Sequence, residues 1–323
     1  MTPVNELVSK LRAGDTRALA RAVSLVENGA AEASALLSAC FPHTGRALRV
    51  GVTGAPGAGK STLVDRLART WRAAGSRVGV IAVDPSSPFT GGALLGDRIR
   101  MQEHANDDGL YVRSMATRGS LGGLANATAD VALVIEASGR DVVLIETVGV
   151  GQDEVEIVRL ADVTIVVLVP GMGDDVQSLK AGLMEIADIF AINKSDRDGA
   201  DRVEKEIRAM QSLSTTQKVE DWTALIVKTT ATTGEGTNGL FAAISHRCKW
   251  LGMEGRLEAR RATYWRERVE AMLRQALLKE ARANGLSEDE LKMHANRIAS
   301  GTEDPYRLVE GLVAKLFGNG VRS

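Results

Sequence analysis

The sequence predicts an α/β fold in which a mostly parallel central sheet is flanked by helices. Seven apolar runs support this prediction, most of them separated by helix-like segments: 47–53, 78–83, 110–115, 141–146, 163–169, 188–192 and 223–228. Several runs, such as 163–169, are apolar without alternation, which is typical of a strand covered on both faces. Such folds place their chemistry at the carboxyl ends of the strands.

Length and composition limit what surrounds this sheet. The chain has 323 residues, 44% of them hydrophobic, and a net charge of −1, so it offers no broad basic field for nucleic acid or a membrane. It shows no long apolar run and no signal pattern, so we expect a soluble, cytoplasmic protein. Three regions are expected: an N-terminal helical extension at 1–45, the α/β domain at 46–249 and a C-terminal helical region at 250–323.

The N-terminal extension carries apolar residues at helical spacing. Leu7 and Leu11 mark one short helix, and Leu19 and Val23 mark a second, for which Asp15 is the expected N-cap. We expect these helices to pack on the main domain. They carry no recognisable chemistry.

The first strand leads into a glycine-rich loop that opens a helix. The loop reads Gly54, Ala55, Pro56, Gly57, Ala58, Gly59, Lys60, Ser61 and Thr62. This spacing is that of a P-loop, whose bare backbone lets N–H groups surround a phosphate at a helix N-terminus. We expect Lys60 to reach the outer phosphates and the Ser61 hydroxyl to ligate Mg²⁺. An ordinary strand-to-helix turn would have no use for Lys-Ser there, so the predicted fold is a P-loop NTPase.

Two acidic residues follow the second strand. Asp84 ends that strand facing the phosphates, which makes it a candidate ligand of Mg²⁺-bound water or a base for the attacking water. The alternative is that it only opens an Asp-Pro turn. Asp97 lies further along and is a second candidate for the metal. Arg98 and Arg100 are more typical of surface charges than of arginine fingers.

The strand at 141–146 ends in Glu146, beside the expected P-loop strand. An acid there would hold Mg²⁺ directly or through water, and the Gly149 amide would sense the γ-phosphate. The residue after Gly149 is Val150 instead of the glutamine that often positions the attacking water. We therefore expect slow hydrolysis unless another group or a partner supplies this function.

The polar residues that follow the strand at 188–192 indicate which nucleotide base is bound. Asn193, Lys194 and Asp196 follow the strand at 188–192, and the Asp196 carboxylate can accept hydrogen bonds from guanine N1–H and the exocyclic amine. Adenine would leave that carboxylate partly unpaired, so the prediction is GTP. Asn193 is expected to brace the loops, and the Lys194 stem to lie along the purine. Thr230 and Ala231 lie where such folds place a backbone amide against guanine O6.

The C-terminal region reads as amphipathic helices. One stripe recurs at steps of three to four: Trp250, Met253, Leu257, Tyr264 or Trp265, Val269, Met272 or Leu273, and Ala276. It would pack on the core or on a second subunit. We favour a partner helix and therefore a homodimer, because the segment continues past a complete nucleotide-binding fold.

Five segments in this order resemble one family: the loop at 54–62, the stretch at 83–101, Arg-Gly-Ser-Leu-Gly-Gly-Leu at 118–124, Glu-Thr-Val-Gly-Val-Gly-Gln at 146–152, and Asn-Lys-Ser-Asp at 193–196. The sequence resembles the methylmalonyl-CoA mutase-associated GTPases, the G-protein chaperones of adenosylcobalamin-dependent acyl-CoA mutases. The likeness covers about residues 5–317. The segments at 84–101 and 118–124 are more specific to this family than the P-loop is.

The resemblance implies roles for the matching residues. Asp84, Asp97 and Glu146 would be the metal-side and switch acids, and the segment 170–180 would be an additional switch that relays the nucleotide state to the mutase. The polar members of that switch are Asp174, Gln177 and Lys180. The family is homodimeric through its C-terminal helices. We expect the mutase as partner, Mg²⁺ with GTP or GDP, and no cobalamin bound directly to this chain.

Three other functions remain as alternatives. A nickel metallochaperone GTPase would need clusters of cysteine or histidine, whereas Cys40 and Cys248 are far apart and the four histidines are scattered. A kinase of an amino-acid transport system would need a substrate-hydroxyl site, which the sequence does not suggest. A binding scaffold with a dead nucleotide site is disfavoured by the joint presence of Lys60, Ser61 and Asp196.

Overall fold

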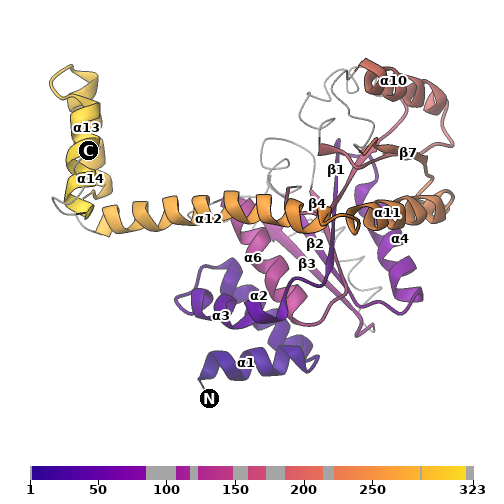
Figure 1. Cartoon of the computed structure of the whole chain (residues 1–323), viewed down its shortest axis with the longest axis horizontal. Coiled ribbons are helices and arrows are strands. Elements are labelled where there is room, and N and C mark those ends of the chain that lie inside the picture. Colours follow the sequence, from indigo (N-terminus) through magenta and orange to yellow (C-terminus); the bar gives the residue numbers. More distant parts are fainter. Residues whose placement is uncertain are drawn as a thin grey trace. The chain divides into compact units, whose positions relative to one another are not determined.

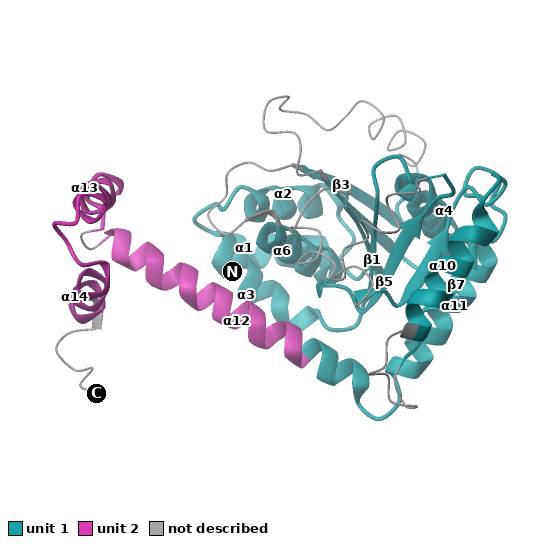
Figure 2. Cartoon of the chain, turned by 90° about the horizontal axis from the view of Figure 1, so that it is seen from above, with its two compact units in different colours: residues 1–261 teal, residues 262–323 magenta. Residues whose placement is uncertain are grey.

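The fold of the chain is seen in a computed structural model (Figure 1), which describes residues 2–84, 107–116, 123–147, 159–171, 186–213, 222–283 and 286–317. The chain forms two compact units, residues 1–261 and residues 262–323, which are coloured separately in Figure 2. The first unit contains the sheet and the nucleotide loops. The described residues of the second unit form helices and the turns that join them.

The first unit is built on a parallel sheet whose strands lie where the apolar runs predicted them. The strands are β1 (Leu48–Gly54), β2 (Val78–Asp84), β3 (Leu110–Ala116), β4 (Val142–Thr147), β5 (Val163–Leu168), β6 (Ile189–Ile192) and β7 (Leu225–Lys228). Their order across the sheet is β3-β2-β4-β1-β5-β6-β7, with every neighbouring pair parallel. The predicted α/β class is confirmed, and β1 lies at the centre of the sheet.

Helices cover both faces of this sheet, as the non-alternating apolar strands predicted. The helices α4 (Lys60–Ala73) and α11 (Thr237–Leu251) pack together on the face that carries Val163 and Ile165. The helix α10 (Ala200–Leu213) packs on Val166 and Leu168, which alternate with those residues and so belong to the opposite face. The helix α6 (Gly123–Ala137) packs on β2 and β4. All six residues of β4 and of β5 are buried.

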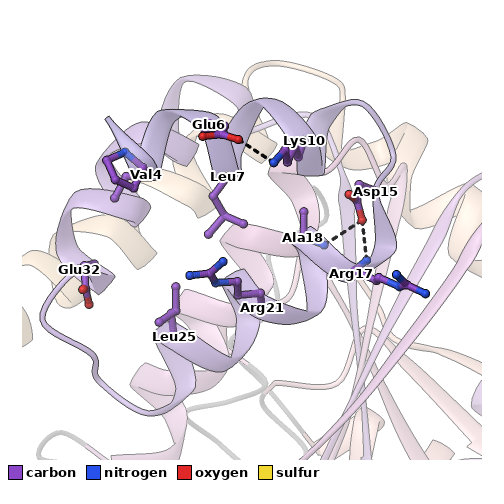
Figure 3. Close-up of a pocket in the computed structure, with 11 residues that line it drawn as sticks. Val4, Glu6, Leu7, Lys10, Asp15, Arg17, Ala18, Arg21, Leu25 and Glu32 are labelled. Carbon is purple, nitrogen blue, oxygen red and sulfur yellow. Dashed lines mark hydrogen bonds and ion pairs between the residues drawn. The ribbon is translucent and has the colours of Figure 1, made fainter. Parts of the chain in front are cut away.

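The N-terminal extension folds as the three helices α1 (Pro3–Arg12), α2 (Thr16–Glu27) and α3 (Ala33–Cys40), with a short 3₁₀ turn at Phe41–His43. The Asp15 side chain caps α2 by accepting the Arg17 and Ala18 N–H groups at 2.8 and 3.0 Å, as expected. Helices α2 and α3 pack on α6. A pocket of about 380 Å³ lies between α1 and α2, where Glu6 and Lys10 form an ion pair (Figure 3).

Two buried carboxylates fix the link from this extension to the sheet. Glu136 on α6 accepts the N–H groups of residues 45–47 and pairs with Arg49 at 2.8 Å. Asp162, which precedes β5, pairs with Arg261 at 2.8 Å, and Arg261 also donates to the carbonyls of residues 45 and 47. These contacts satisfy polar groups that would be costly to bury without a partner.

The C-terminal helices are α12 (Arg256–Ala283), α13 (Glu288–Ala299) and α14 (Pro305–Phe317). Trp250 and Leu257 of the predicted stripe pack against the core of the first unit, whereas Met253 between them is 50% exposed. Val269, Met272 and Leu273 in the second unit are half exposed or more. Among the helices that the structure describes, none has the length and the apolar composition that crossing a membrane requires.

Candidate nucleotide-binding site

The glycine loop joins β1 to α4 at the centre of the sheet, and two of its glycines are required by the packing around them. Gly54 has φ +140°, and a Cβ there would overlap the carbonyl oxygen of Val167 on β5. Gly59 has φ +87°, and a Cβ there would overlap the side-chain amide of Asn193. Glycine is therefore needed at both positions for conformation and for space. These two close approaches explain why the predicted P-loop has glycine at positions 54 and 59.

Lys60, the first residue of α4, is buried and turned back over the loop. Its Nζ donates to the carbonyl oxygens of Gly54 at 2.6 Å and Ala55 at 2.9 Å. The side chain therefore closes across the concave side of the loop, next to the amino end of α4. A cation and a helix N-terminus in one place favour an anion. This is the position that the sequence assigned to the outer phosphates.

A hydroxyl and a carboxylate meet beside the loop. The Ser61 Oγ donates to Glu146 Oε1 at 2.5 Å, and Glu146 is only 6% exposed. The pairing of β1 with β4, in which Val52 lies opposite Glu146, brings the two residues together. Oxygen ligands of this kind are those that Mg²⁺ prefers. The pair therefore fits the predicted Mg²⁺ ion.

The other predicted acids are placed only in part. Asp84 is the last residue of β2, and Val83 lies opposite Thr147 on β4, so the Asp84 backbone belongs to the same edge of the sheet as Glu146. Its side chain lies outside the described residues. Asp97, Gly149, Asp174, Gln177 and Lys180 also lie outside the described residues, and their roles remain predictions.

The polar loop after β6 is joined directly to the P-loop. Asn193 is 2% exposed, and its Nδ2 donates to the Ala58 carbonyl at 2.8 Å. Its Oδ1 accepts the Ala231 N–H at 3.0 Å, so one side chain joins the P-loop to the turn after β7. The Lys194 Nζ donates to the Gly57 carbonyl at 2.7 Å. Asp196 follows in the same loop and is exposed. The structure thus brings together both loops that the sequence assigned to one nucleotide.

The two residues of the turn after β7 that were expected near guanine O6 both donate their N–H groups to protein acceptors. The Thr230 N–H donates to the Glu235 carbonyl at 2.9 Å, and the Ala231 N–H donates to Asn193 Oδ1 at 3.0 Å. The physical reason is the buried Asn193 oxygen, which needs a donor. Thr232, the next residue along the turn, is exposed.

Sequence reasoning missed one residue of this site. Arg66 on α4 donates through Nε to the Ala231 carbonyl at 3.0 Å and through Nη2 to the Thr232 carbonyl at 2.6 Å. No local pattern in the sequence identifies it, because its partners are 165 and 166 residues away.

The parallel sheet, the glycine loop closed by Lys60 and the Ser61–Glu146 pair define a P-loop NTPase. The loop at 193–196, tied to the P-loop, is typical of the members that use GTP. The profile of the family described as "Methylmalonyl Co-A mutase-associated GTPase MeaB" matches residues 19–286. The chain belongs to this family and is a GTPase, which confirms the resemblance noted in the sequence.

Comparisons with single proteins agree with this family. A Pyrococcus horikoshii chain, whose name goes no further than GTPase, is 48% identical over 98% of this chain and 100% of its own length. GTPase ArgK of Escherichia coli is 39% identical over 78% of both chains. The mouse mitochondrial methylmalonic aciduria type A homolog is 31% identical over 97% of this chain and 79% of its own. A solved structure, the LAO/AO transport system kinase, superposes with a TM-score of 0.71 at 29% identity, covering 96% of both chains.

Proposed function

We propose that this GTPase is a chaperone of an adenosylcobalamin-dependent acyl-CoA mutase, with methylmalonyl-CoA mutase as the first choice. In this proposal it gates the loading of intact cofactor and protects or reactivates the mutase. The observation that carries it is the family profile, which matches residues 19–286 and names a mutase-associated GTPase. The name of the mouse relative, which refers to methylmalonic aciduria, gives independent support.

In the proposed site, backbone N–H groups of residues 54–62 and the Lys60 ammonium hold the phosphates. Ser61 and Glu146 hold Mg²⁺, with Asp84 and Asp97 as further acids on the metal side. The ion, when bound, neutralises charge on the phosphate oxygens. The Gly149 amide senses the γ-phosphate.

The base is held at the other end of the site. Asp196 accepts hydrogen bonds from guanine N1–H and the exocyclic amine, Lys194 lies along the purine, and the turn at Thr230 and Ala231 faces O6. Asn193 keeps these loops in register with the P-loop. Its contacts with Ala58 and Ala231, at 2.8 and 3.0 Å, support this role.

Coupling to the mutase would run through residues 170–180, with Asp174, Gln177 and Lys180 as the polar relay. If mutase binding favours the arrangement that hydrolyses GTP, then the bound nucleotide must alter mutase affinity by the same factor, because coupling is reciprocal. Cobalamin stays on the mutase. The cytoplasmic location expected from the sequence belongs to the same proposal, since the two proteins must share a compartment.

We also propose a homodimer formed through the second unit. Val269 and Leu273 are both 57% exposed and Met272 is 50% exposed, at the spacing of one helix face. A second copy of this face would remove these side chains from water. Sedimentation should give about twice 34.4 kDa for the native protein, and Leu273→Glu should shift it to the monomer. A native monomer would contradict the proposed dimer.

The chaperone proposal is tested with the mutase itself. Mutase and cobalamin-domain partners are captured from the native host with and without a non-hydrolysable GTP analogue, and GTP hydrolysis is measured with the recovered enzyme. We expect low basal turnover that rises at least tenfold in the complex. Ser61→Ala should abolish that rise, whereas exposed Arg202→Met should leave it unchanged. An unstimulated wild-type rate in a stable complex would count against the proposal.

A second candidate is a kinase of an amino-acid transport system. Its support is the likeness to the LAO/AO transport system kinase, which superposes with a TM-score of 0.71. Incubation with GTP labelled on the γ-phosphate and a binding protein of the transport system separates the two activities. Label in free phosphate supports the chaperone proposal, and label on the binding protein supports the kinase.

A further inference from the structure

One arginine ties the phosphate-binding helix to the turn that follows β7. Arg66 lies on α4, the helix that begins with Lys60, and it holds the consecutive carbonyls of Ala231 and Thr232 at 3.0 and 2.6 Å. A guanidinium presents its N–H groups as a rigid planar fork, whereas a lysine offers a single point charge. Two neighbouring peptide groups of the turn are therefore held in one orientation.

The turn held by Arg66 is also fixed by hydrogen bonds within itself. The Thr230 N–H donates to the Glu235 carbonyl at 2.9 Å, and the Gly234 N–H donates to the Thr230 carbonyl at 2.9 Å. The turn also contacts the polar loop after β6: Asn193 Oδ1 accepts the Ala231 N–H at 3.0 Å and the Thr229 hydroxyl at 3.3 Å, and the Ser195 N–H donates to the Thr229 carbonyl at 3.1 Å. Asn193 thus holds this segment through the Ala231 N–H, and Arg66 holds it through the carbonyls of Ala231 and Thr232.

The held carbonyl determines where the next N–H group points. In a trans peptide, the carbonyl of one residue and the N–H of the following residue point in opposite directions. Because the Ala231 carbonyl faces Arg66, the Thr232 N–H faces away from Arg66. Thr232 is exposed, and within the described ranges its N–H meets no protein acceptor. Among the described residues, this N–H is thus a donor that is left available for a ligand.

We propose that Arg66 is a positioning residue for guanine recognition, because it aims the backbone of this turn, with the Thr232 N–H, at O6 of the base. The inference rests on the proposed guanine site. It assigns to α4 a role at both ends of the nucleotide, with Lys60 at the phosphates and Arg66 acting on the base through the turn.

The test compares three diphosphates that differ only in the base. GDP carries O6 and the exocyclic amine, IDP carries O6 without the amine, and 6-thio-GDP carries sulfur, a weak acceptor, in place of O6. Affinities are measured by calorimetry for the wild type, Arg66→Met and Arg66→Lys. Exposed Arg202→Met, whose partner is Glu206, is the matched control.

We expect Arg66→Met to weaken GDP and IDP about tenfold and 6-thio-GDP less than threefold, so that the preference for O6 over sulfur shrinks. Arg66→Lys should fall in between, and Arg202→Met should match the wild type. Ratios of affinities on one sample do not depend on the fraction of folded protein. An equal loss for all three ligands, or no loss, would overturn the role of Arg66. Wild-type protein that binds none of them would instead refute the guanine site.

Discussion

Asn193 offers the sharpest test of how the two nucleotide loops are held together. The variant Asn193→Asp keeps the oxygen that accepts the Ala231 N–H but replaces the Nδ2 donor, which lies 2.8 Å from the Ala58 carbonyl, with a second oxygen. Removing this donor leaves the buried Ala58 carbonyl unpaired, which costs about 1–3 kcal/mol. We therefore expect the nucleotide-free protein to lose roughly 1–3 kcal/mol of unfolding free energy at pH 7.

The pH dependence of this loss identifies its cause. Burial and the facing carbonyl favour the protonated form of the introduced carboxyl, so its folded pKa lies above the unfolded value of about 3.9. Such a group stabilises the fold at low pH, and that contribution disappears as the pH rises through the folded pKa. The difference between wild type and variant should thus shrink from pH 7 toward pH 4.

The assay is urea unfolding followed by tryptophan fluorescence at several pH values. Asn5→Asp serves as the control, because Asn5 is exposed on α1 and the change there should alter the unfolding free energy by less than about 0.5 kcal/mol. If Asn193→Asp behaves like this control, or if its cost is the same at every pH, then Asn193 does not brace the loops through the donor contact described above.

Three further predictions concern other parts of the first unit. Burial raises the pKa of both Cys40 and Cys248 to about 11, so a thiol reagent at pH 8 should label them slowly unless urea is present. The unfolding free energy should fall between pH 9 and 11, because the thiols of the unfolded chain ionise at lower pH than those of the folded protein. Arg261→Met should cost about 2–4 kcal/mol in urea unfolding, because it leaves buried Asp162 with fewer partners. Asp196→Asn should lower GTP affinity at least tenfold in calorimetry and gain affinity for XTP, because its amide can donate to the xanthine 2-carbonyl.

Local patterns in the sequence predicted the sheet and the loops well. Strand positions follow from unbroken apolar runs, and the bounds of β5 at Val163–Leu168 differ from the predicted run by one residue. The cap at Asp15 was also predicted, because its side chain acts on N–H groups within three residues of itself. Contacts between residues that are close in the sequence can be predicted from the sequence of a single chain.

Long-range polar contacts could not be predicted in this way. Arg66 acts on residues 165 and 166 positions away, and Arg261 bonds to a carbonyl 216 positions away. An arginine on a helix is usually a surface residue, and nothing in the neighbouring sequence marks either of these two. The Ala231 amide shows the same limit, since its partner is chosen by the burial of Asn193 rather than by the turn itself.

The two ends of the site are held differently, which bears on how a GTPase of this family could signal. On the base side, Asn193, Lys194 and Arg66 join the loops through hydrogen bonds between protein groups. The shortest hydrogen bond of each side chain measures 2.8, 2.7 and 2.6 Å, respectively. Because none of these partners is a phosphate group, we expect the contacts to be the same with GTP and with GDP. We therefore predict that the difference between GTP and GDP acts on the metal side, where Ser61 contacts Glu146 and where Gly149 is predicted to sense the γ-phosphate. A site built in this way can keep guanine affinity nearly constant while its metal side changes with the nucleotide, so that binding and signalling are separable by mutation.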